Sequence, residues 1–202
     1  MALKPINWTK LTVSEEGVKH PTYGQYGGAG YSSGKVLKAG ETPSFVATPI
    51  DALDETFREH DVASYRAISH RDQALADRQL IDDIKVIPDA QMSPEAHLYA
   101  GWAILTMIEQ ITVKHHQAGL LSLSQLASYT KEASHHLALG RPEPDRAETA
   151  AFATWLKTTA GLDNPFGFGA DPAPQPVPTA SPDPGPLDDL ASHLSSVRDL
   201  YF

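Results

Sequence analysis

The 202-residue chain contains no cysteine. A disulfide framework, a thiolate zinc site and a cysteine nucleophile are therefore excluded. No apolar run is long enough to span a bilayer, and the most apolar stretch, residues 99–113, contains Glu109 and Gln110, which predicts a buried helix. Basic residues are also scarce, since 16 Lys and Arg stand against 25 Asp and Glu and give a net charge of −9. That balance argues against a nucleic-acid partner.

The first eight residues lack the apolar core of a signal peptide. We therefore expect synthesis in the cytoplasm. Export by a non-classical route and carriage in a virion both stay open.

Apolar periodicity predicts five helices and an all-α fold. The first helix begins at Pro49. The other four cover about Gln73 to Val86, Ser93 to His116, Ser122 to Leu139 and Asp145 to Ala160. Residues 1–22 show no strong period, and residues 35–48 form a connector with a short extended piece at 44–47. Residues 164–186 contain eight prolines, which is typical of a linker or a disordered tail, and 187–202 could form a short amphipathic helix.

The dipeptide His60-Asp61 lies on the first predicted helix, downstream of a loop at 23–34 that holds five glycines. Helical periodicity turns His60 toward the core and places Asp61 about 100° around the helix. Histidine is the natural general base near neutral pH, and a second carboxylate behind it, such as Asp77 on the next helix, would fix its tautomer. Glycines let successive backbone carbonyls point at one centre, which together with a carboxylate suits calcium.

Residues 30–36 partly match a phosphate-binding loop. The motif requires a glycine at position 29 and Ser or Thr at position 36, and the chain has Ala29 and Val36 there. Ser32 and Lys35 have the Ser-x-x-Lys spacing of some acyl transferases without the companion motifs. Neither chemistry is favoured.

Residues 23–85 resemble a phospholipase A2. The calcium loop of that family reads Tyr-Gly-x-Tyr-x-Gly-x-Gly, and residues 23–30 match every fixed position. Its active helix reads Pro-x-Asp-x-Leu-Asp, then five residues, then His-Asp, and residues 49–61 match at the same spacing. Residues 77–85 are similar to the partner helix of bacterial and parvoviral members. The predicted fold is accordingly an antiparallel helix pair with a glycine-rich calcium loop and additional C-terminal helices.

The resemblance implies calcium-dependent hydrolysis of the sn-2 ester of glycerophospholipids at a membrane surface. Water activated by His60 would attack the ester, and Asp77 would orient His60. The implied Ca²⁺ ligands are the carbonyls of Tyr26, Gly28 and Gly30 and the carboxylate of Asp61. The Gly28 N–H could join the cation in an oxyanion hole.

Several departures from the family leave alternatives open. About fifteen residues are inserted before Pro49. Ser64 stands at a family tyrosine, and Tyr65 could replace it through a helix irregularity. Asp82 or Asp83 could take the place of Asp77. Tyr31 and Phe45 could contact lipid at the pocket mouth. The histidine pairs at 115–116 and 135–136 are interpreted as solvated side chains, and metal binding by them is less favoured.

The predicted domains are a helical domain at 1–162, with a catalytic core at about 20–88 and extra helices at about 93–161, and an acidic Pro-rich tail at 163–202. The shifted tyrosine keeps a second reading open, a lipid-binding or membrane-perturbing module without turnover. In a third reading the C-terminal half is an interaction module, and the tail could bind a protein partner.

Overall fold

The computed structural model describes residues 5–13, 19–142 and 145–155. The chain divides into two compact units, Met1–Asp163 and Asn164–Phe202, and every described residue belongs to the first. The predicted Pro-rich tail at 163–202 and the short helix predicted at 187–202 lie outside the described residues. Among those residues, no helix combines the length and the apolar character needed to cross a membrane.

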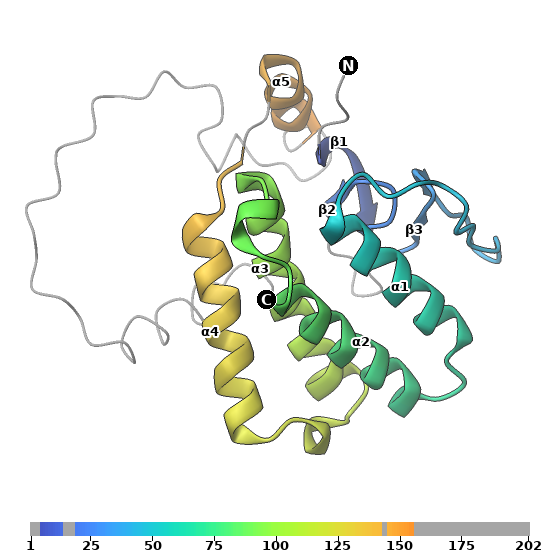
Figure 1. Ribbon diagram of the computed structural model, residues 1–202. Helices are drawn as coiled ribbons and strands as arrows, with labels where there is room; N and C mark the ends of the chain where they lie inside the picture. Colours follow the sequence, from blue (N-terminus) through green and yellow to red (C-terminus); the bar gives the residue numbers. More distant parts are fainter. Residues whose placement is uncertain (1–4, 14–18, 143–144, 156–202) are drawn as a thin grey trace, which may run out of the picture. The chain divides into compact units, whose positions relative to one another are not determined.

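The prediction of an all-α fold is wrong, because the described part combines five α-helices with two small antiparallel sheets (Figure 1). Strand β1 (Ile6–Val13) pairs with β2 (Lys19–Tyr23), and β3 (Tyr31–Ser32) pairs with β4 (Lys35–Val36). The register of β1 against β2 shifts between Asn7 and Leu11, which breaks the two-residue alternation that identifies a strand in sequence. Pro21 is tolerated in β2 because both strands of a two-stranded sheet are edges.

Two adjacent helices carry the residues of the predicted site. Helix α1 (Ala52–Arg66) begins three residues after Pro49, and its cap is Asp51, whose side chain accepts the Asp54 N–H. Helix α2 (His70–Lys85) follows after a connection of three residues, so the pair runs antiparallel. Figure 1 shows the N-terminal end of α1 beside the first sheet.

The second half of the described chain is helical, and its first helix packs on α2. Helix α3 (Pro94–Glu109) is capped by Ser93, whose hydroxyl accepts the Ala96 N–H, and it contacts both α2 and α4 (Leu123–Leu139). It was expected to run to His116 but changes at Gln110–Lys114 into a π-helix. Short 3₁₀ turns lie at Asp89–Gln91 and Ala118–Leu120, and α5 (Arg146–Trp155) comes last.

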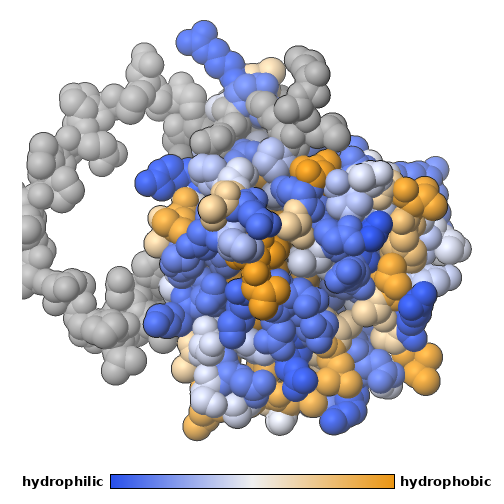
Figure 2. Space-filling view, in the orientation of Figure 1, coloured by the Kyte–Doolittle hydropathy of each residue, from blue (hydrophilic) through white to orange (hydrophobic). Residues whose placement is uncertain are grey.

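The core joins the two halves. It contains aromatic residues of the loop and sheet region together with the inner faces of α1, α2 and α3; its largest fully buried members include Tyr23, Tyr26, Leu53, Leu80, Ile81, Ile84 and Ile104. Glu95 in the first turn of α3 accepts the indole N–H of Trp8, which fastens β1 to the helices. Leu123, the first residue of α4, is 87% exposed and lies outside this core. On the face drawn in Figure 2, apolar residues form separate patches among hydrophilic ones.

Candidate active site

His60 and Asp77 lie against each other across the α1–α2 interface. The Nε2 atom of His60 is 2.8 Å from Oδ1 of Asp77, and Asp77 is only 1% exposed. The hydroxyl of Ser64 lies one turn along α1, 3.3 Å from the same nitrogen. The other two candidates for this position face elsewhere: Asp82 accepts the Tyr129 hydroxyl, and Asp83 accepts an amide N–H of Gln79.

The second ring nitrogen of His60 faces Asp61. Nδ1 is 3.9 Å from Oδ1 of Asp61, which is too far for a hydrogen bond. The Oδ2 atom of Asp61 is buried, and no hydrogen-bond partner for it occurs among the described residues. Burial raises the pKa of Asp61 to about 8, and the nearby carboxylate of Asp54 adds to the shift. Such a carboxylate is costly to ionise unless a cation compensates its charge.

Asp54 fixes the glycine-rich loop to α1. Its carboxylate accepts the backbone N–H groups of Gln25, Tyr26 and Ile50 at 2.9–3.0 Å. Gly24 makes this approach possible, because its φ is +51° and a Cβ there would lie 2.3 Å from Cγ of Asp54. Asp61 follows Asp54 by two helical turns and therefore lies on the side of α1 that faces the loop.

The predicted carbonyl ligands lie in the loop between β2 and β3. Tyr26 is buried, and its hydroxyl donates to the carbonyl of Ala47 at 2.7 Å. The carbonyls of Gly28 and Gly30 accept the N–H groups of Tyr31 and Leu37, at 3.1 and 2.7 Å. A carbonyl oxygen has two lone pairs, so each can still contribute to a cation.

His115 also belongs to this site, and the sequence analysis missed it. It is 6% exposed, and its Nε2 lies 3.2 Å from Oδ2 of Asp77, although the two atoms are not aligned as a hydrogen bond. Burial lowers the pKa of the His115 imidazole, and the nearby carboxylate of Asp77 opposes this shift. Asp77 thus lies between two imidazoles. Residues 115–116 were interpreted as a solvated pair, and this is wrong for His115, while His116 is exposed.

Tyr65 does not take the role of the family tyrosine. Helix α1 is regular across this position, Tyr65 is 59% exposed, and its ring packs against Phe45 with centroids 6.1 Å apart. Tyr31, for which lipid contact was left open, is buried, and its hydroxyl donates to the Gly24 carbonyl.

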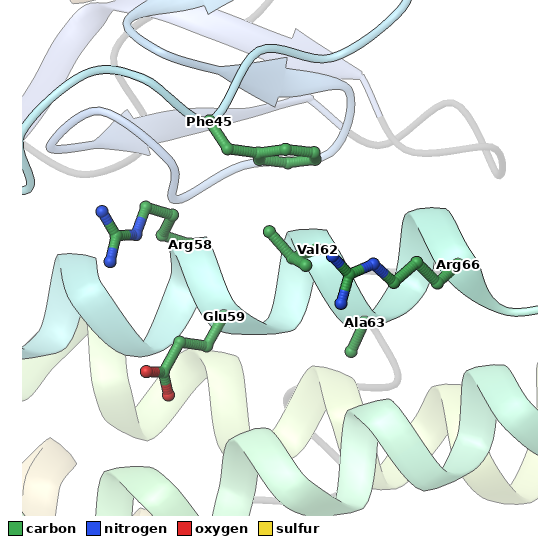
Figure 3. A pocket seen from close by; sticks show the side chains of 6 residues that line it. All are labelled: Phe45, Arg58, Glu59, Val62, Ala63 and Arg66. Carbon is green, nitrogen blue, oxygen red and sulfur yellow. The ribbon is translucent and has the colours of Figure 1, made fainter.

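A hollow of about 420 Å³ lies between Phe45 and the outer surface of α1 (Figure 3). Its lining consists of Phe45, Arg58, Glu59, Val62, Ala63 and Arg66. Figure 3 shows the ring of Phe45 above the helix, with Arg58, Val62 and Arg66 on the side of α1 that faces it. His60, Asp61 and Asp77 do not line this hollow, so it is separate from the candidate active site.

The features with a sequence signal were the helix spacing of His60, Asp61 and Asp77 and the glycines of the loop. His115 had no such signal, because only the π-helix determines the direction of its side chain. Comparison with known proteins identifies no relative: no family model, curated protein or solved structure matches this chain.

Proposed function

We propose that the protein is a calcium-dependent phospholipase A2. The observation that carries the proposal is the division of the two His60 nitrogens between two carboxylates, Asp77 at Nε2 and Asp61 near Nδ1. One nitrogen is held as a donor by a buried acceptor, and the other makes no hydrogen bond to its neighbour. This is the arrangement that a general base for water requires.

The proton transfers follow from this arrangement. Asp77 accepts the Nε2–H of His60, which leaves the lone pair on Nδ1. Nδ1 takes a proton from a water molecule that attacks the carbonyl carbon of the ester, and later returns it to the leaving alcohol oxygen. Asp77 stabilises the imidazolium between the two steps, and no covalent acyl intermediate is needed.

The residues around Asp61 fit a calcium ion. The buried Oδ2 without a hydrogen-bond partner is an orphaned acceptor, and a cation is the ligand that would satisfy it. The carboxylate of Asp61 and the carbonyls of Tyr26, Gly28 and Gly30 would hold the ion. When bound, it would polarise the ester carbonyl and stabilise the negative charge that develops on its oxygen.

The outer face of α1 supports a phospholipid surface as the peripheral partner. Arg58 and Arg66 lie beside the apolar Phe45 and Val62 around the hollow. Val46 and Ile68 are 90% and 95% exposed. Contact of such apolar side chains with water is unfavourable, and a lipid surface would cover them. Basic groups near apolar side chains suit an anionic lipid interface.

The test is release of fatty acid from mixed phospholipid vesicles labelled at the sn-2 chain, with and without Ca²⁺. We expect Ca²⁺-dependent release by the wild type, and its loss in His60→Gln and in Asp61→Asn. His116→Gln, the same change at an exposed histidine, is the matched control. Vesicle leakage that persists in EDTA and in His60→Gln, without hydrolysis, would instead identify a membrane-perturbing module.

A further inference from the structure

Three metal-ligating side chains meet at the α3–α4 contact, in residues that the proposed hydrolysis does not use. Asp89 comes from the first 3₁₀ turn, His97 from the first turn of α3 and His136 from the last turn of α4. Each offers a ligand atom, and these atoms lie within 4.8 Å of one another. We propose that they form a second metal site, for a divalent transition metal of the zinc class, which fastens α3 to α4.

The two imidazoles are already close to the spacing that zinc needs. Their Nδ1 atoms are 2.9 Å apart, and His97 and His136 are 5% and 1% exposed. Two nitrogens on one tetrahedral zinc, each bound at about 2.0–2.1 Å, lie about 3.3 Å apart, so a widening of a few tenths of an ångström is enough.

Outer groups around the cluster support ligation through Nδ1. The Nε2 atom of His136 is buried, has no hydrogen-bond partner among the described residues, and lies 3.6 Å from Oε1 of Glu132. When Nδ1 binds a metal, Nε2 carries the proton and faces this carboxylate, as metal-binding histidines commonly do. On the third ligand, Oδ2 of Asp89 lies 3.0 Å from Nε2 of His135.

Helix packing holds the ligands in place. Gly140, directly after α4, lies so close to α3 that a Cβ there would be 2.7 Å from the Cα of Leu98. The end of α4 therefore rests on the first turn of α3, next to both histidines. A site built on two packed helices needs little reorganisation to bind its ion. With three protein ligands, the fourth position of a tetrahedral ion would be filled by water.

The interpretation of residues 135–136 as a solvated pair is wrong for His136. His135 is exposed, but His136 is buried within the α3–α4 contact. The sequence offers no recognisable zinc spacing, because the two histidine ligands are 39 residues apart and the carboxylate precedes both.

The experiment titrates the full chain, stripped with a chelator, with Zn²⁺ by calorimetry and with Co²⁺ by visible absorption. We expect one Zn²⁺ per chain at this site, the visible bands of four-coordinate Co²⁺, and a rise in Tm of roughly 5–10 °C at about 100 times Kd. His136→Gln should abolish the site, and Asp89→Asn, at an exposed position that can change without unfolding the chain, should weaken it roughly 10–100-fold. Two matched controls, His116→Gln and Asp61→Asn, should bind Zn²⁺ as the wild type does.

The proposal is overturned if the wild type shows no four-coordinate Co²⁺ spectrum, or if both Asp89→Asn and His136→Gln bind Zn²⁺ with unchanged affinity. Loss of the Co²⁺ bands in Asp61→Asn with their retention in Asp89→Asn would also refute it, because the metal would then occupy the candidate active site. Circular dichroism of each variant separates loss of ligands from loss of fold.

Discussion

The calcium affinity of the candidate active site should depend steeply on pH, and Asp61 sets the dependence. Burial raises the pKa of Asp61 to about 8 in the ion-free protein. Only about 9% of the molecules therefore carry the ionised carboxylate at pH 7, compared with about 90% at pH 9. Because Ca²⁺ binds the ionised form, we expect the apparent affinity to rise about tenfold between these two pH values and then to level off.

The same reasoning predicts a proton balance. At pH 7 each bound Ca²⁺ should release about 0.9 proton from Asp61, and at pH 9 only about 0.1. Calorimetry in two buffers of different protonation enthalpy measures this number directly. Glu59→Gln should behave as the wild type does. Equal affinity and no proton release at pH 7 and pH 9 would refute the assignment of Asp61 as the buried ligand, and so would unchanged Ca²⁺ binding by Asp61→Asn.

Further variants test the surrounding groups. Asp77→Asn should lower kcat about 10³–10⁴-fold in the vesicle assay, because the imidazolium loses its buried counter-charge. His115→Phe should lower kcat roughly tenfold, with partial retention in His115→Gln, which keeps an N–H for Asp77. In Gly24→Ala, a Cβ only 2.3 Å from Cγ of Asp54 should destabilise the fold by roughly 1–3 kcal/mol and weaken Ca²⁺ binding, measured by thermal melts and calorimetry. Asp61→Asn should stabilise the Ca²⁺-free protein by up to about 4 kcal/mol at pH 7 in denaturant titrations.

The sign of the Asp61 effect on stability follows from linkage. Its pKa is higher in the folded chain than the ordinary value of about 3.9. Between those two values the folded state binds more protons than the unfolded state, so the free energy of unfolding falls as pH rises and becomes constant above about 8. Asparagine removes this dependence, and Ca²⁺ should remove it in the wild type. The account is contradicted if the stability of the Ca²⁺-free wild type rises between pH 5 and pH 8 and that of Asp61→Asn rises by the same amount. Asp61 would then contribute nothing to the pH dependence.

Local signals in the sequence located most of the helices. Helices were expected to begin at about Ser93 and to run from about Ser122 to Leu139, and these bounds are confirmed, since Ser93 and Ser122 are the residues that cap α3 and α4. Caps and stops are readable because they depend on neighbours three or four residues away. The pairing of His60 with Asp77 was implied by the family resemblance, with Asp82 and Asp83 left open. Two helices joined by a short turn bring corresponding turns side by side, which is how α1 and α2 place these two side chains together.

Features set by distant contacts were not readable. The strand β1 was missed because its bulge interrupts the alternation, and its strand partner β2 contains a proline. Buried His97 and His136 meet only because α4 packs on the start of α3. No local pattern distinguishes such a histidine from an exposed one, as the contrast between His135 and His136 demonstrates.

His115 brings the second half of the described chain into the candidate active site. In the π-helix the N–H of His115 bonds to the carbonyl of Gln110, five residues back, at 2.8 Å. An uninterrupted α-helix would bond it four residues back and would rotate the side chain to a different direction. The π-helix thus turns the imidazole toward Oδ2 of Asp77, while His60 lies at Oδ1. A buried carboxylate contacted on both oxygens has little freedom to rotate, so the orientation of His60 depends on a residue outside the α1–α2 pair.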